Sequence, residues 1–100
     1  MSLETISSSQ LIYYLNHPEY RIVDLREHQA FVRGHIQSAI NIPYDVYREK
    51  FAMLPKDITY ILYCERGGSS LMAARWLDTK GYNVLSLNGG IHGYNGRLYV

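Results

Sequence analysis

The fold is constrained most by one stretch, residues 58–71, which reads ITYILYCERGGSSL. Its first six residues form a run of apolar, β-branched and aromatic side chains, which is typical of a strand covered on both faces. Cys64 follows that strand, and a short glycine loop leads into a helical segment in which Ser69 or Ser70 is expected at the N-cap. Cys64 is therefore expected at the carboxyl edge of a sheet, where α/β proteins bind ligands.

The position of Cys64 predicts a reactive thiolate. Unpaired N–H groups and a partial positive charge gather at a helix N-terminus, and both favour an anion placed over them. Gly67 and Gly68 allow the loop to curl closely around the sulfur, and Arg66 adds a positive charge nearby. We therefore expect a nucleophilic thiolate held by backbone amides. The alternative is a buried cysteine that acts only as a small apolar side chain, a role that does not require this loop composition.

The composition limits the classes of function. One hundred residues allow a single domain, residues 1–100, and 47% hydrophobic residues indicate a globular chain. Ten basic and nine acidic residues nearly cancel, which disfavours a nucleic-acid partner or a polybasic membrane-binding role. No apolar run approaches the roughly 20 residues that span a bilayer. Cys64 is the only cysteine, which excludes an internal disulfide and predicts a reducing, cytoplasmic location.

Strand-like and helix-like segments alternate along the chain. Strands are expected at residues 4–6, 21–25, 39–42, 58–63 and 83–87, and helices at residues 7–16, 27–32, 44–54 and 69–80. Ser7 and Gln10 match a capping box for the first helix, while Gly34 and Gly81 are expected as left-handed stops of the second and fourth. Residues 91–100 are expected to form a short helix or loop at the sheet edge. The alternation predicts an α/β fold with a parallel or mainly parallel sheet and helices on both faces.

Four motifs carry a resemblance to a known family. They are Asp24-x-Arg26, Gly34-His35-Ile36-x-x-Ala39-Ile40-Asn41-Ile42-Pro43, Tyr63-Cys64-x-x-Gly67 and Leu87-x-Gly89-Gly90. Their order and spacing resemble those of single-domain rhodanese-like sulfurtransferases over nearly the whole chain. The resemblance implies a three-layer α/β/α fold with a mainly parallel five-stranded sheet. It also implies that Cys64 accepts a sulfane sulfur as a persulfide and passes it to a nucleophile.

The implied reaction is a sulfur transfer in two displacements. A thiosulfate or persulfide donor first gives its sulfur to Cys64, and an external thiol or cyanide then removes that sulfur. Because the chain has no second cysteine, the acceptor has to come from outside, as a small thiol or a thiol of a partner protein. No cofactor is expected, and no metal ion either, because no pair of histidines lies at metal-ligand spacing from Cys64.

The loop after Cys64 is expected to bind the sulfur donor. The expected substrate-binding residues are Glu65, Arg66, Gly67, Gly68, Ser69 and Ser70. Active members of the family commonly carry an arginine five places after the cysteine, and here that place is Ser69. A hydroxyl can hydrogen-bond an anion but carries no charge, which removes roughly 1–3 kcal/mol of donor binding. We therefore expect weak activity with thiosulfate.

Three further residues are expected near the site in structural roles. The resemblance implies that Asp24 and Arg26 tie loops together by hydrogen bonds and an ion pair. The His35 ring is expected to hydrogen-bond neighbouring loops, because a thiolate already stabilised by helix amides needs no general base. Glu65 would oppose ionisation of the thiol, so we expect it to point to solvent and to pair with a basic group of a partner.

Two other functions compete with sulfur transfer. Rhodanese-like domains also serve as interaction or regulatory modules, and the missing arginine at Ser69 keeps that alternative open. Phosphatases of this architecture place an arginine six residues after the cysteine, where this chain has Ser70, so a phosphatase is less favoured. The presence of Cys64 and its glycines favours the sulfurtransferase.

Overall fold

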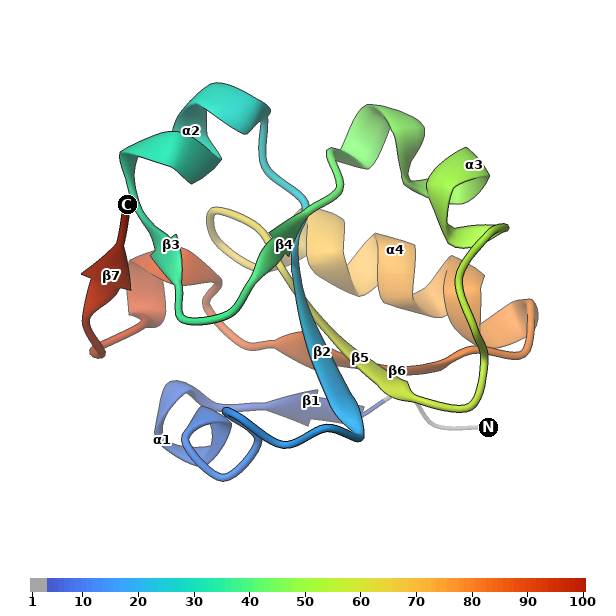
Figure 1. Cartoon of the computed structure of the whole chain (residues 1–100), viewed down its shortest axis with the longest axis horizontal. Coiled ribbons are helices and arrows are strands. Elements are labelled where there is room, and N and C mark those ends of the chain that lie inside the picture. The colour runs from blue at the N-terminus through green and yellow to red at the C-terminus, as the bar shows by residue number, and fades with distance from the viewer. Residues whose placement is uncertain (1–3) are drawn as a thin grey trace.

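The computed structural model describes residues 4–100 (Figure 1). Its elements in chain order are β1 (Glu4–Ile6), α1 (Ser8–Leu11), β2 (Tyr20–Asp24), α2 (His28–Arg33), β3 (His35–Ile36), β4 (Ile40–Asn41), the 3₁₀ turn η1 (Tyr44–Val46), α3 (Tyr47–Phe51), β5 (Thr59–Tyr63), α4 (Gly68–Thr79), β6 (Asn83–Leu87), the 3₁₀ turn η2 (Ile91–Gly93) and β7 (Leu98–Tyr99). Within residues 4–100, none of the helices combines the length and the apolar character that crossing a bilayer requires.

Five strands form one sheet in the order β1-β6-β5-β2-β4. The central strand is β5, in which Ile61 is in register with Ile22 of β2 and with Leu85 of β6. All neighbouring pairs in this sheet are parallel, which confirms the predicted sheet. The carboxyl ends of these strands therefore face one edge, which is the edge where Cys64 follows β5.

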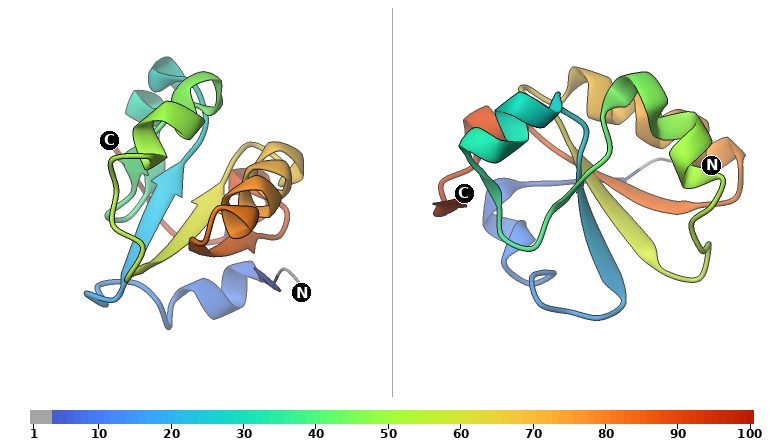
Figure 2. Two further views of the ribbon diagram at one scale, coloured as in Figure 1. Left: turned by 90° about the vertical axis from the view of Figure 1, so that its right-hand side faces the viewer. Right: turned by 45° about the horizontal axis from the view of Figure 1, so that its top comes forward.

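Alternate residues of β5 enter two separate cores, one on each face of the sheet. Tyr60 and Leu62 belong to the core covered by α3 and α4, whereas Ile61 and Tyr63 belong to the core that Leu11 of α1 and Phe31 of α2 join. Figure 2 shows helices on both sides of the strands. The predicted α/β/α layering is therefore confirmed, and it explains why the sequence of β5 is apolar without interruption.

The helix after Cys64 begins earlier than the sequence predicts. Its first residue is Gly68, and Gly67 occupies the N-cap with a φ of 105°. The expected N-cap at Ser69 or Ser70 was wrong, because a glycine in the left-handed region turns the chain into the helix without a side-chain hydrogen bond. Both serines consequently lie in the first turn of α4.

The other helix ends test the capping signals. The capping box of Ser7 and Gln10 is present, although α1 makes little more than one turn. Gly81 has the predicted left-handed conformation, with a φ of 91°. The left-handed stop predicted at Gly34 was wrong, because its φ of 162° and ψ of 129° carry the chain in extended form into β3. The helix predicted over residues 44–54 is divided into η1 and α3 at Val46, whose φ of −123° and ψ of 7° leave the helical region.

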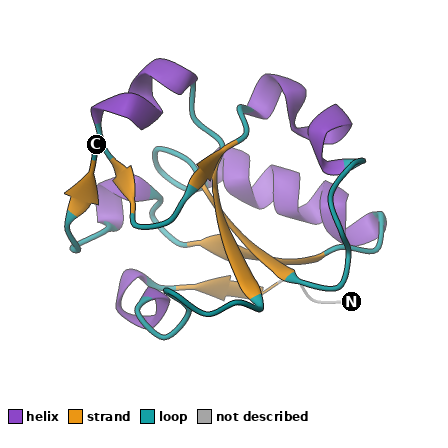
Figure 3. Cartoon of the chain, in the orientation of Figure 1, coloured by secondary structure: helices purple, strands orange, loops and turns teal. Residues whose placement is uncertain are grey.

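The tail of the chain contains a strand that the sequence does not predict. Strand β7 pairs antiparallel with β3, which places Leu98 opposite Ile36 in a small second sheet (Figure 3). A Cβ atom on Gly34 would lie 3.4 Å from the Leu98 side chain, so β7 packs directly over Gly34. The pairing ties the end of the chain to the segment that follows α2.

Candidate functional site

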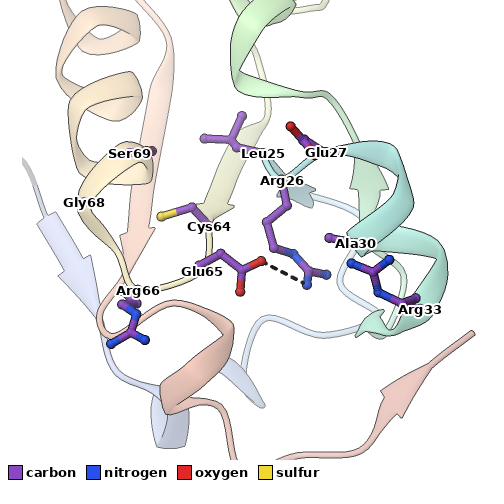
Figure 4. Close-up of a pocket in the computed structure, with 10 residues that line it drawn as sticks. All are labelled: Leu25, Arg26, Glu27, Ala30, Arg33, Cys64, Glu65, Arg66, Gly68 and Ser69. Carbon is purple, nitrogen blue, oxygen red and sulfur yellow. Dashed lines mark ion pairs between the residues drawn. The ribbon is translucent and has the colours of Figure 1, made fainter.

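Cys64 lies at the carboxyl end of β5, with its sulfur turned toward the first turn of α4 (Figure 4). The sulfur accepts hydrogen bonds from the backbone N–H of Gly67 at 3.1 Å and of Ser70 at 3.3 Å. Only 7% of the residue is exposed, yet it lines a pocket. The loop therefore holds the sulfur with main-chain donors while one side of it faces the pocket.

The two glycines of the loop have different roles. Gly67 requires the left-handed conformation, and a Cβ atom there would lie 3.3 Å from the backbone nitrogen of Gly89. Gly68 has ordinary helical geometry, and a Cβ atom there would have no neighbour within 4 Å. The conformation of the loop therefore depends on Gly67 and not on Gly68.

A second turn, which contains Gly89 and Gly90 and follows β6, packs against the Cys64 loop. The carbonyl groups of Cys64 and Glu65 accept hydrogen bonds from the backbone N–H of Ile91 at 2.9 Å and of His92 at 3.0 Å. A Cβ atom on Gly90 would lie 2.5 Å from both carbonyl oxygens, so only a glycine allows this approach. These bonds fix the loop carbonyls on the side of η2.

The hydroxyl of Ser70 lies beneath the loop and not in the pocket. It is completely buried, donates a hydrogen bond to the Gly67 carbonyl at 3.1 Å and shares one of 2.9 Å with the hydroxyl of Ser86 on β6. The Cys64 thiol lies 3.6 Å from the same hydroxyl, as a donor to it. Ser70 thus contacts the sulfur from below, and its hydroxyl joins the loop to the sheet.

Three N–H groups of the loop remain available. Among residues 4–100, the backbone N–H groups of Arg66, Gly68 and Ser69 have no hydrogen-bond acceptor. Gly68 and Ser69 belong to the first turn of a twelve-residue helix, where such groups favour a bound anion. The loop can therefore bind a negatively charged atom beside the Cys64 sulfur.

The pocket over Cys64 has a volume of about 570 Å³ and two main walls (Figure 4). The loop wall consists of Cys64, Glu65, Arg66, Gly68 and Ser69. The opposite wall, which sequence reasoning missed apart from Arg26, consists of Leu25, Arg26, Glu27, Ala30 and Arg33. A topological signal for it existed, because in a parallel sheet the segments that follow neighbouring strands meet at one edge, and Asp24 at the end of β2 is in register with Tyr63 at the end of β5.

A buried ion pair supports the wall opposite the loop. The Arg26 guanidinium donates to both carboxylate oxygens of Asp24, at 2.7 to 3.1 Å, and to the Gly34 carbonyl at 2.6 Å. The fully buried Asp24 also accepts a hydrogen bond of 2.7 Å from the Tyr63 hydroxyl. Burial opposes the charge of Arg26, yet the hydrogen bond and the charge of Asp24 raise the pKa of Arg26 above its ordinary value. Burial and the hydrogen bond to Asp24 also raise the pKa of Tyr63.

His35 lies outside the pocket lining. Its Nδ1 is 2.9 Å from the Phe31 carbonyl oxygen, and its ring stacks on the Phe31 ring at a centroid distance of 4.0 Å. These contacts join β3 to α2. Within the described part of the chain, His, Cys, Asp and Glu side chains do not gather in a group that could hold a metal ion.

Glu65 has its basic partners within this chain. Its carboxylate lies 3.1 Å from Nε2 of His92 and 3.8 Å from Nη1 of Arg26, and its side chain is half-exposed. The sequence did not predict these partners, because His92 reaches the loop only through the turn after β6. A carboxylate therefore lies next to Cys64 at the pocket wall, where it repels a small anion.

The chain matches the family model for the rhodanese-like domain over residues 7–97. A tRNA uridine(34) hydroxylase of Erwinia tasmaniensis is 31% identical over 96 residues, which cover 89% of this chain and 27% of that protein. The chain thus spans about a quarter of the length of the curated relatives it matches.

Two solved structures resemble the whole chain. A rhodanese-related protein from Thermoplasma volcanium has a TM-score of 0.84 and 30% identity, with 96% of this chain and 97% of that one covered. A rhodanese-like domain protein from Staphylococcus aureus has a TM-score of 0.85 and 25% identity, with 98% of each chain covered. Because the family match includes four strands of the sheet and the loop that holds Cys64, this chain belongs to the rhodanese-like domain family.

Proposed function

We propose that this domain is a sulfurtransferase that carries a sulfane sulfur on Cys64. The observation that carries the proposal is the pair of backbone N–H groups at 3.1 and 3.3 Å from the sulfur, at the wall of an open pocket. Such donors bind a thiolate more strongly than a neutral thiol, because the hydrogen bonds become charge-assisted. The thiolate is the form that attacks sulfur.

In the first displacement, the Cys64 thiolate attacks the outer sulfur of the donor. A new S–S bond forms on Cys64, and the S–S bond of the donor breaks. Thiosulfate loses sulfite, and an organic persulfide loses a thiolate, and in each case the leaving group takes the bonding electron pair. The free N–H groups of Gly68 and Ser69 are available to the terminal sulfur of the Cys64 persulfide.

In the second displacement, an acceptor thiolate or cyanide attacks that terminal sulfur. The S–S bond on Cys64 breaks, the Cys64 thiolate returns to the loop, and the acceptor leaves as a persulfide or as thiocyanate. Since Cys64 is the only cysteine, the acceptor is an external molecule. The scheme needs no metal or organic cofactor, because each step exchanges one S–S bond for another bond to sulfur.

Thiosulfate is expected to be a poor donor for this pocket. Ser69 provides a hydroxyl where active relatives have a guanidinium, and the Glu65 carboxylate lies on the same wall. A small dianion at the loop therefore meets the Glu65 carboxylate, and Ser69 adds no cation beside the sulfur. A persulfide or polysulfide, which carries less charge, suits the loop better.

Two alternatives have separate support. The missing arginine at Ser69 favours an interaction module that has lost activity. The second alternative is a part in the reaction named for the curated relatives, tRNA uridine(34) hydroxylase. This chain spans only 27 to 28% of those proteins. Sulfur transfer accounts directly for the Cys64 loop, whereas an interaction module does not require amides around the sulfur.

Initial rates of sulfur transfer to cyanide and to a small thiol test the proposal. With inorganic polysulfide as donor, a double displacement predicts parallel lines in double-reciprocal plots, and Cys64→Ser abolishes transfer. Ser9→Ala, an exposed change in α1, is the matched control and leaves the rates unchanged. Transfer that persists in Cys64→Ser refutes the proposal, and absence of transfer from every donor favours the interaction module.

A further inference from the structure

The positive charges of the Cys64 pocket are unevenly distributed. The guanidinium of Arg26 is held by Asp24 and by the Gly34 carbonyl, so it belongs to the scaffold. Arg66 is exposed, and Figure 4 shows its guanidinium pointing away from the Cys64 sulfur. The loop wall therefore offers backbone N–H groups to an anion but no free cation that faces the sulfur.

Arg33 is the remaining arginine of the pocket. It is the last residue of α2, is exposed, and lies on the wall opposite the loop (Figure 4). Among residues 4–100, its guanidinium has no carboxylate within 4.0 Å and no hydrogen-bond acceptor, although Glu65 lines the same two cavities. Arg33 is thus free to bind an anionic group of a ligand.

The site for the sulfane sulfur, at Cys64, is therefore on one wall of the pocket, and the free cation, Arg33, is on the other. Thiosulfate carries its anionic oxygens next to the sulfane sulfur, so its charge would lie near Ser69 and Glu65 when the sulfur reaches Cys64. A carboxylate that is several bonds away from the sulfane sulfur can instead reach the wall of Arg33. The volume of about 570 Å³ allows such a molecule, since small-molecule sites commonly measure roughly 300–1,000 Å³.

Building on the proposed sulfurtransferase function, we infer that Arg33 selects an organic persulfide that carries a carboxylate several bonds from its sulfane sulfur, as an amino-acid or peptide persulfide does. The Cys64 thiolate attacks the terminal sulfur of R–S–SH. The S–S bond of the donor breaks, R–S⁻ leaves with the electron pair, and Cys64–S–SH keeps the transferred sulfur with its proton. Arg33 takes no part in bond exchange and acts by holding the donor carboxylate.

Rapid mixing of the reduced protein with two probes tests this inference. The probes are glutathione persulfide and the same molecule with both carboxylates esterified, and the readout is the second-order rate constant for formation of the Cys64 persulfide. Arg33→Gln lowers the constant for glutathione persulfide roughly three- to fivefold, as expected for an exposed ion pair, and leaves the ester unchanged. Arg33→Lys retains most of the rate. Arg75→Gln, on the exposed face of α4 and outside the pocket, changes neither constant.

The dependence of the rate constant on ionic strength is a second readout. If Arg33 had only a structural role, Arg33→Gln would not alter this dependence. Raising the ionic strength slows the wild-type reaction with glutathione persulfide toward the Arg33→Gln rate and has less effect on that variant. Equal rates of wild type and Arg33→Gln with glutathione persulfide overturn the inference but leave the sulfurtransferase intact. A larger loss in Arg66→Gln than in Arg33→Gln also overturns it. If the wild-type protein takes no sulfur from either probe or from polysulfide, the proposed function fails as well.

Discussion

At the scale of single residues, we expect Ser69 to limit the activity of the pocket with thiosulfate. It is exposed in the first turn of α4 and lines the pocket beside Cys64. Ser69→Arg adds a guanidinium that can make a charge-assisted hydrogen bond to the donor, worth about 1–3 kcal/mol. We predict that this change raises kcat/KM for thiosulfate roughly five- to hundredfold.

The matched control for Ser69→Arg is Thr79→Arg, which adds the same charge at the exposed far end of α4. It should leave the thiosulfate rate unchanged. If Ser69→Arg has no effect, or if both variants accelerate the reaction equally, the missing arginine is not the cause of weak thiosulfate activity.

We predict that the Tyr63 hydroxyl makes the free energy of unfolding fall in alkaline solution. Burial and the hydrogen bond to Asp24 raise the pKa of its hydroxyl in the folded protein. Below the unfolded pKa of about 10, both states keep the proton and the contribution is complete. Above it, the unfolded chain loses this proton while the folded protein keeps it, so the free energy of unfolding falls by about 1.4 kcal/mol per pH unit. Tyr60 and Tyr94 shift in the same direction.

Urea unfolding at about pH 8 and about pH 11 measures this contribution. Between the two conditions, Tyr63→Phe should lose less free energy of unfolding than the wild type. At the lower pH the variant should already be less stable by about 1–3 kcal/mol, because Asp24 loses a buried hydrogen-bond donor. Equal losses in the two proteins would mean that Tyr63 does not retain its proton when folded.

The sequence identifies the chemistry of the loop better than the chemistry of the pocket. Cys64, Gly67 and the residues that follow them are adjacent in the chain, so their proximity is given by covalent structure. Arg33 and Glu27 reach the site through the packing of α2, and the pairing of Glu65 with His92 spans 27 residues. No local pattern encodes contacts of that separation.

At the scale of elements, the turn from β5 into α4 holds the sulfur. Gly67→Ala forces an alanine into a φ near 105° and brings its Cβ close to Gly89, so we predict a loss of stability of about 1–2 kcal/mol. Because the Gly67 N–H is one of the two donors to the Cys64 sulfur, persulfide formation should also slow, by roughly tenfold.

Gly68→Ala is the matched comparison one residue further on. A Cβ atom at Gly68 meets no neighbour within 4 Å, and its backbone is already helical, so the fold should tolerate alanine. Thermal unfolding and the rate of persulfide formation, measured on both variants, separate the two positions. Equal effects of the two substitutions would show that the left-handed turn at Gly67 does not matter.

Sequence patterns predict the long elements well, and they also predict the short strands β1 and β4. The strand β5 and the C-terminal end of α4 at Gly81 agree with prediction, because hydrophobic period and a glycine stop act locally. The N-cap predicted for α4 was wrong because Gly67, and not a serine, takes that position. Its left-handed φ depends on the contact with the turn at Gly89, which the local sequence does not show. Strands of two residues, such as β3 and β7, are too short to show any period.

At the scale of the whole molecule, the parallel sheet creates the site. Strands β2 and β5 are neighbours, so the segments that follow them form the two walls of one pocket (Figure 4). The alternation of strands and helices predicts that these segments share an edge, but the order of the strands depends on packing between distant parts of the chain. The sheet order and the C-terminal pairing of β7 therefore could not be derived from patterns alone.

The mass of the intact protein after incubation with inorganic polysulfide shows whether Cys64 carries a sulfane sulfur. We expect that the wild-type chain gains the mass of one sulfur atom, that a small thiol then removes it, and that Cys64→Ser gains nothing. If the wild-type chain gains no sulfur from polysulfide, thiosulfate or an organic persulfide, or if Cys64→Ser gains as much as the wild type, Cys64 is not a sulfur carrier.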